Sequence, residues 1–243
     1  MAKIPEDPKE IFQEITKDYR DIFKDDLISI MLYGSATGKD YRAGKSDINF
    51  MIVLSETGIE NLEPAFRIVT KWRKRRVAIP LFLTRGYIET STDVFPIEYL
   101  NFQRNHHLIY GEDILAELSF EKGLIRLQCE REIKGKLLLL RESFLESNGK
   151  GMMLKNIISQ SIPAFLAIFD ALLFLKGRES PTKKRSTIED TCETYNMDKA
   201  LFTKLLDIKE QKIKPSDHEL KGIFKGYLKE IRSLAKKVDE LGG

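Results

Sequence analysis

The sequence predicts an α+β fold, in which a β-sheet with packed helices is followed by an all-helical bundle. From about Ser119 onward the apolar residues recur with the 3.6-residue period of helices, whereas the chain before it contains short, apolar, β-prone runs. We therefore expect two domains, residues 1–118 and residues 119–243. The expected strands of the first domain are residues 28–33, 48–54, 77–83 and 94–100.

Length, composition and charge narrow the class of protein. The 243 residues suffice for two modest domains, each with its own core. With 42% hydrophobic and 32% charged residues, the chain is not expected to be disordered. A net charge of +3 does not by itself imply nucleic acid as a partner, although a local basic patch still could bind it; we do not expect such a partner. Residues 1–8 have no apolar signal core and no apolar run is long enough to span a membrane, so we expect a cytoplasmic protein without a membrane partner.

Two amphipathic helices are expected beside the strands, at residues 7–26 and 61–76. The second one ends in Lys-Trp-Arg-Lys-Arg-Arg, residues 71–76, which we call the basic run. These cations either bind phosphates, a nucleic acid such as tRNA, or the acidic face of a partner, or they form a cationic helix C-terminus that the helix dipole favours. We favour the second interpretation.

The second domain is expected to consist of amphipathic helices. Its most apolar segment, residues 164–175, is too short for a membrane span, so we expect a buried bundle helix. Ser216 begins the last helix with a Ser-x-x-Glu capping box. The expected helices are residues 124–146, 153–176, 186–195, 197–207 and 216–241.

A Gly-Ser turn follows the first predicted strand. Gly34 allows another group to approach the backbone closely, and Ser35 offers a hydroxyl and an N–H at the start of the next segment. Such a turn suits phosphate oxygens, although most Gly-Ser pairs are only turns.

Two polar side chains mark the start of the second predicted strand. Asp47 and Asn49 are two residues apart, so the strand period puts both on one face, and Ile48 and Phe50 on the other. Oxygen ligands beside a phosphate-binding turn are typical of a Mg²⁺-nucleotide site. In the simpler alternative, Ser46 and Asp47 only cap or initiate a turn.

The combination of strand, Gly-Ser turn, about a dozen residues and then Asp-hydrophobic-polar-hydrophobic resembles the DNA polymerase beta-type nucleotidyltransferase superfamily, particularly its small bacterial members. In them, Gly-Ser is followed by Asp-x-Asp or Asp-x-Glu. Gly34, Ser35 and Asp47 match this pattern, but Asn49 stands where the second acidic residue is expected. The resemblance implies a minimal mixed β-sheet with helices.

In the resembled family a third carboxylate lies on a later strand, shortly before a segment that ends in Gly and an acid. Residues 107–113 fit that ending, and Glu98 lies among apolar residues in the predicted strand before it. Glu98 is therefore the candidate third carboxylate. The alternative is an exposed side chain on an alternating strand.

The helical second half resembles, by architecture, the all-α C-terminal domains of small bacterial nucleotidyltransferases of the kanamycin nucleotidyltransferase-like type, which are related to HEPN helical domains. Some HEPN domains are ribonucleases with an Arg-x(4–6)-His motif. His218 has no arginine at that upstream distance, so we expect no ribonuclease chemistry.

The resemblance implies a function and residue roles. A nucleoside monophosphate would be transferred from a nucleoside triphosphate, with ATP as the first choice, to a hydroxyl of a small molecule or a protein, with Mg²⁺ or Mn²⁺ as the cofactor. The turn at Gly34 and Ser35 would bind the β and γ phosphates, and Asp47 would bridge the metal ions. Asn49 and Glu98 would complete the coordination.

Three residues leave alternatives open. Arg42 and Lys45, in the loop before the second strand, either contact triphosphate oxygens or are only solvated. Asn49 removes one negative charge from a site that must hold two divalent cations, so activity would be weak, single-metal or absent. The alternative function is therefore a catalytically inactive module that binds a nucleotide or a partner. The acceptor, the nucleotide and the oligomeric state, with a homodimer among the options, stay open.

Overall fold

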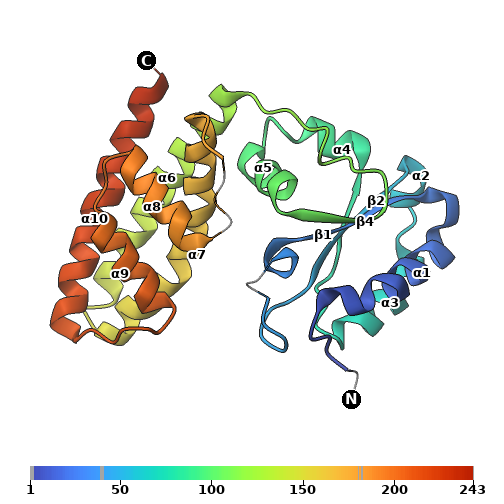
Figure 1. Ribbon diagram of the computed structural model, residues 1–243, viewed down its shortest axis with the longest axis horizontal. Coiled ribbons are helices and arrows are strands. Elements are labelled where there is room, and N and C mark those ends of the chain that lie inside the picture. The colour runs from blue at the N-terminus through green and yellow to red at the C-terminus, as the bar shows by residue number, and fades with distance from the viewer. Residues whose placement is uncertain (1–2, 39–40, 180, 182, 243) are drawn as a thin grey trace. The chain divides into compact units, whose positions relative to one another are not determined.

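The computed structural model describes residues 3–38, 41–179, 181 and 183–242 (Figure 1). The chain forms two compact units. The first contains Met1–Val94 and Phe102–Ser119, and the second contains Phe95–Asn101 and Phe120–Gly243. This division differs from the predicted one chiefly in the short segment Phe95–Asn101, which belongs with the helical second unit.

The first unit is built on a mixed four-stranded sheet in the order β3-β2-β1-β4. β1 (Leu27–Tyr33) pairs antiparallel with both β2 (Asn49–Leu54) and β4 (His106–Gly111). β3 (Leu81–Thr84) pairs with β2 in parallel and forms an edge of the sheet. The predicted α+β class and mixed sheet are thus confirmed.

The two central strands present one face to a helical layer. Because side chains alternate along a strand, the even-numbered residues 30–32 and 48–54 all join one apolar core. α1 (Phe12–Phe23) and α3 (Phe66–Arg73) lie side by side on this face (Figure 1) and close the core with the fully buried Tyr19 and Trp72. Burial of this face therefore sets the register of β2, and with it the direction in which Asp47 and Asn49 point.

Short elements connect the strands and helices of the first unit. Asp7 opens the first of them with a capping box, in which its side chain accepts from a backbone N–H. These elements are η1 (Pro8–Ile11), η2 (Lys24–Asp26), η3 (Gly34–Thr37), α2 (Glu56–Ile59), η4 (Glu63–Ala65) and α4 (Arg85–Thr90).

The fourth predicted strand is wrong, because α5 (Pro96–Arg104) occupies this part of the chain. Pro96 begins the helix, where its missing N–H and fixed φ are tolerated. Ile97 and Leu100, three residues apart, both enter the core of the second unit. The Ile97 N–H has no partner within the first helical turn and donates to the Gln128 side-chain oxygen at 2.8 Å. Packing against the bundle therefore stabilises residues 96–104 as a helix, although the local residue pattern predicted a strand.

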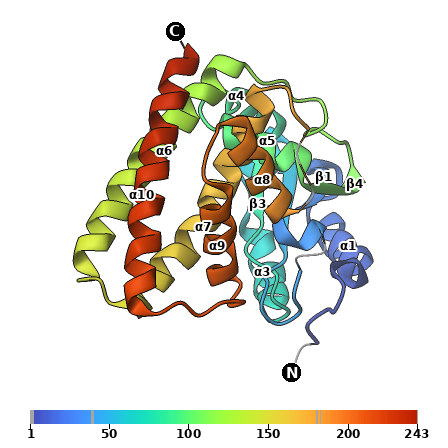
Figure 2. The same ribbon diagram turned by 60° about the vertical axis from the view of Figure 1, so that its left-hand side comes forward.

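The second unit is a helical bundle with α7 (Gly151–Leu175) at its centre. This helix contacts α6 (Lys122–Glu146), α8 (Lys184–Thr194), α9 (Lys199–Lys209) and α10 (Asp217–Asp239), which lie beside it in Figures 1 and 2. By length and composition α7 could cross a membrane, with a mean hydropathy of 1.8, but half of that window is buried within the protein. It is therefore the expected bundle core helix. The short η5 (Glu240–Gly242) follows α10.

The bundle core is rich in aromatic side chains that meet edge to face. Phe202 contacts both Phe169 and Tyr227 in this way, with ring centroids 5.5 and 5.9 Å apart. Ser216 begins α10 with the predicted capping box. No strand is found among the described residues of this unit, so the predicted all-helical second half is confirmed.

Candidate functional site

The Gly-Ser turn begins where β1 ends. Gly34 has a left-handed φ of +77°, a conformation that glycine adopts without strain. The Thr37 hydroxyl closes the turn by donating to the Gly34 carbonyl at 2.8 Å. A β-carbon added at position 34 would lie 3.4 Å from Nδ2 of Asn49, so the turn lies directly against the start of β2. Ser35 is exposed beside it.

Asp47 and Asn49 face away from the core, as the strand period predicted. Ile48 and Phe50 are fully buried, whereas Asp47 is exposed and Asn49 is half-buried. In the pairing of β1 with β2, Asn49 lies opposite Tyr33, which directly precedes the turn. The structure therefore brings the Gly-Ser turn, Asp47 and Asn49 to the same end of the sheet.

Arg76, the last residue of the basic run, faces this end of the sheet. Its guanidinium lies 3.6 Å from Oδ1 of Asp47 and also donates to the Gly44 carbonyl in the loop before Asp47. This pair is not evident from the sequence pattern. One feature of the sequence does set Arg76 apart from the other cations of the run: it immediately precedes a predicted strand, whereas a helix dipole acts only on cations within the last turn of the helix.

Lys71 and Arg75 of the basic run bind acidic side chains of α1 and not the region of the turn. Lys71 pairs with Glu14 and Asp18 of α1 at 2.9 and 2.6 Å, and Arg75 also pairs with Glu14. Both cations lie over the Trp72 ring, and the ring N–H of Trp72 donates to Asp18 of α1 at 2.9 Å. The hydrogen bond from Lys71 holds the pKa of the Glu14 carboxyl below its usual value. Lys71 and Arg75 are thus structural cations that join two helices.

Arg42 and Lys45 lie on the exposed loop between the turn and β2. The loop is a compact turn, since the N–H groups of Lys45 and Ser46 donate to the Arg42 carbonyl at 3.0 and 2.8 Å. Both cationic side chains are exposed. Their contact with triphosphate oxygens stays a prediction.

Comparison of the structure with solved structures finds chains of similar fold. Spectinomycin adenyltransferase AAD(9) from Enterococcus faecialis, crystallised with ATP and spectinomycin, matches with a TM-score of 0.52 over 92% of this chain and 99% of that one. The two proteins share a fold. Sequence identity is 14%, so the similarity shows a shared fold and does not by itself show a shared activity. No family model matches the sequence, and no curated protein matches it significantly.

Glu98 lies on α5, within the second unit, and not on a strand of the sheet. Its carboxylate accepts a hydrogen bond from the Gln128 side-chain nitrogen at 2.7 Å. Glu98 is exposed on the outward face of the helix whose other face enters the bundle core. The premise that it belongs to a strand is therefore wrong, and its role as a third carboxylate stays a prediction.

The residues around the turn do not fit a pair of Mg²⁺ ions. Two such ions need several anionic oxygen ligands to offset their mutual repulsion. Asp47 supplies one carboxylate, which is paired with Arg76, and Asn49 supplies a neutral amide. In the described part of the chain, no group of three or more His, Cys, Asp or Glu side chains is arranged to hold a metal ion.

His106 makes a pair that the sequence analysis did not anticipate. Its Nε2 lies 2.8 Å from Oδ1 of Asp113, and its Nδ1 lies 3.0 Å from the backbone carbonyl oxygens of Phe102 and Gln103. Because no carboxylate or cysteine stands at metal-ligand spacing from it in the sequence, His106 is expected to be a loop or helix-surface residue. Because both ring nitrogens face protein oxygen atoms, His106 joins the end of α5 to the segment that follows β4, which is a structural role.

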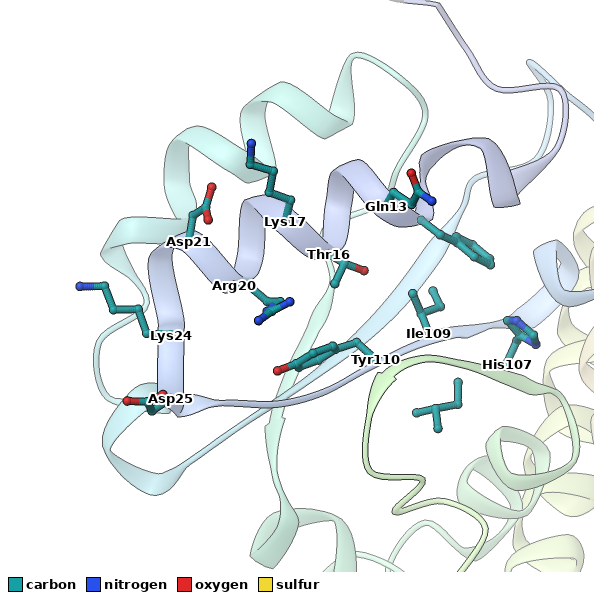
Figure 3. A pocket seen from close by; sticks show the side chains of 12 residues that line it. Gln13, Thr16, Lys17, Arg20, Asp21, Lys24, Asp25, His107, Ile109 and Tyr110 are labelled. Atoms are coloured by element: carbon teal, nitrogen blue, oxygen red, sulfur yellow. The ribbon is translucent and has the colours of Figure 1, made fainter.

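A groove of about 850 Å³ lies between α1 and β4 (Figure 3). The Phe12 ring stacks on His107 at one end, and the Arg20 guanidinium lies 5.2 Å above the Tyr110 ring at the other. Thr16 also lines it, and its buried hydroxyl has no hydrogen-bond partner among the described residues. None of the predicted site residues lines this groove, so it is separate from the Gly-Ser turn.

Proposed function

We propose that the protein is a nucleotidyltransferase that binds a nucleoside triphosphate, with ATP as the first choice, at the turn of Gly34 and Ser35. The observation that carries the proposal is the left-handed Gly34 held against Asn49, next to Asp47, at one end of the sheet. The fold is similar to that of an adenyltransferase crystallised with ATP, which supports a nucleotide as the ligand. The start of a short helix after the turn offers N–H groups that suit phosphate oxygens.

The proposed reaction is an in-line displacement at the α-phosphorus. The acceptor oxygen forms a bond to this phosphorus while the bond to the bridging oxygen of the β-phosphate breaks, so pyrophosphate leaves. The acceptor proton passes to a general base, for which Glu98 is the sequence-based candidate. The turn N–H groups would hold the phosphates in place, and Arg42 and Lys45 would offset the charge of the leaving pyrophosphate.

Two classes of acceptor fit the proposed reaction. A small molecule with a free hydroxyl is the first choice, because the structurally similar protein was crystallised with spectinomycin. A protein hydroxyl is the other. Mg²⁺ or Mn²⁺ would act as the cofactor of the transfer, and Asp47 is the carboxylate at the turn that could hold such an ion.

A second candidate function is a module that binds a nucleotide or a partner without catalysis. The ion pair of Asp47 with Arg76 and the neutral Asn49 favour it, because both lower the negative charge that a metal-dependent transfer requires.

The two functions separate in a transfer assay. The protein is incubated with each α-labelled nucleoside triphosphate, with Mg²⁺, Mn²⁺ or a chelator, and with spectinomycin, a panel of hydroxylated small molecules or a cell extract. Label appearing on an acceptor, and lost in Asp47→Ala but kept in the exposed-acid control Asp93→Ala, supports transfer. Nucleotide binding without label transfer supports the module. Absence of binding of any nucleotide refutes the nucleotidyltransferase and the nucleotide-binding module, and leaves only a module that binds a partner.

A further inference from the structure

We propose that Arg76 binds a phosphate group of the nucleotide, so that the site holds a nucleoside triphosphate without needing a divalent cation. The inference rests on the proposed function, since it concerns how the turn at Gly34 recognises the same nucleotide. It differs from the metal-bridged binding that the resemblance implies, because a protein cation takes the place of the metal charge.

The backbone of Arg76 is fixed beside the candidate site. The Ile48 N–H donates to the Arg76 carbonyl at 2.9 Å, and the Ala78 N–H donates to the Ile48 carbonyl at 2.9 Å. These bonds form a parallel bridge between Val77 and Ile48, the residue between Asp47 and Asn49. The guanidinium can therefore change partners while its backbone stays next to the Gly-Ser turn.

Arg76 occupies a backbone position that usually belongs to glycine. It follows the end of α3 with a left-handed φ of 66°, and the Val77 N–H reaches back to the Trp72 carbonyl at 3.2 Å, as in a Schellman motif. Glycine fits this conformation without strain, whereas arginine does not. A strained residue whose side chain points to a candidate site indicates a role for that side chain.

The ion pair between Arg76 and Asp47 can be replaced by a contact between Arg76 and a phosphate. The two groups are 3.6 Å apart, and their side chains are 44% and 59% exposed, so the pair is solvated and weak. A phosphate is a stronger partner, because the planar guanidinium can donate two parallel hydrogen bonds to two of its oxygens.

The charges around the turn favour an anion over a cation. Asp47 contributes one negative charge, Asn49 contributes none, and Arg42, Lys45 and Arg76 contribute three positive charges. A triphosphate is attracted to such a group, and the cations offset the charge that divalent ions offset in a two-metal site.

The test measures ATP affinity by calorimetry for the full chain, in a chelator and in Mg²⁺. Arg76→Gly removes the guanidinium and relieves the backbone strain, so the variant is expected to fold, which the fluorescence of the buried Trp72 checks. Loss of a charge-assisted contact should weaken ATP binding in the chelator by about tenfold or more. Arg76→Lys should keep part of the affinity, and the control Lys74→Ala, an exposed cation two residues away, should keep all of it.

The outcomes separate this inference from the proposed function. Binding in the chelator that weakens in Arg76→Gly and not in Lys74→Ala supports it. Binding that requires Mg²⁺, or that is equal in Arg76→Gly and wild type, overturns it and leaves the proposed function standing. Absence of ATP and other nucleotide binding in both buffers overturns the two together.

Discussion

Gly34→Ala is expected to destabilise the first unit by about 1 kcal/mol. A β-carbon in the left-handed region, at φ +77°, costs an L-residue roughly 1–2 kcal/mol, because it crowds the neighbouring carbonyl oxygen. The new methyl would meet Nδ2 of Asn49 at 3.4 Å, an ordinary contact that adds little. Alanine also restricts the unfolded chain, which returns about 0.4–1 kcal/mol.

Gly38→Ala is the matched control, four residues along the same segment. Gly38 has an extended φ of −133°, and a β-carbon there would meet no atom within 4 Å. This variant should be unchanged or more stable, by up to about 1 kcal/mol. Trp72 is the single tryptophan of the chain and is buried in the first unit, so its fluorescence during urea unfolding reports on the unit that contains both glycines.

The same two variants also test whether the turn at Gly34 binds phosphate. If the Gly34 conformation shapes the turn, Gly34→Ala should weaken ATP binding, whereas Gly38→Ala should not. Equal unfolding free energies for the two variants would refute the argument that the left-handed φ limits this position.

Three further predictions concern charge, pH and packing. Asn49→Asp should make ATP binding respond to Mg²⁺, because a second carboxylate beside Asp47 favours a divalent ion; an unchanged, negligible response on Mg²⁺ titration of both proteins would contradict catalysis at a metal site. Glu14→Gln should lower stability at pH 7. The hydrogen bond from Lys71 lowers the pKa of Glu14 in the folded protein below 4.5. The loss of unfolding free energy relative to wild type should therefore be complete above pH 4.5 and should vanish as the pH falls through the pKa of the folded state. Urea unfolding over a pH series measures this. Gln128→Ala should destabilise the second unit by roughly 1–3 kcal/mol, because it leaves a buried N–H of α5 unpaired; an unfolding midpoint equal to that of wild type would rule this out.

Local patterns in the sequence were enough to predict the two central strands, the turn that follows the first of them, and the helical bundle. The strand period put Ile48 and Phe50 in the core and Asp47 and Asn49 outside, because a strand has only two faces and one must be buried. Helical spacing and the capping signal at Ser216 likewise depend on residues a few positions apart, so they can be read from the chain alone.

Tertiary contacts decided the rest of the candidate site. α5 is a helix because Gln128, far along the chain, satisfies its first turn and because the bundle buries its apolar face. His106 meets Asp113 only because the chain turns back after β4. Arg76 points away from the other cations of the basic run, because its own left-handed backbone conformation redirects the chain after α3. This brings the Arg76 guanidinium to Asp47. A backbone reversal or a long-range partner leaves no periodic signal in the sequence, so the charge of the candidate site is decided by the folded structure.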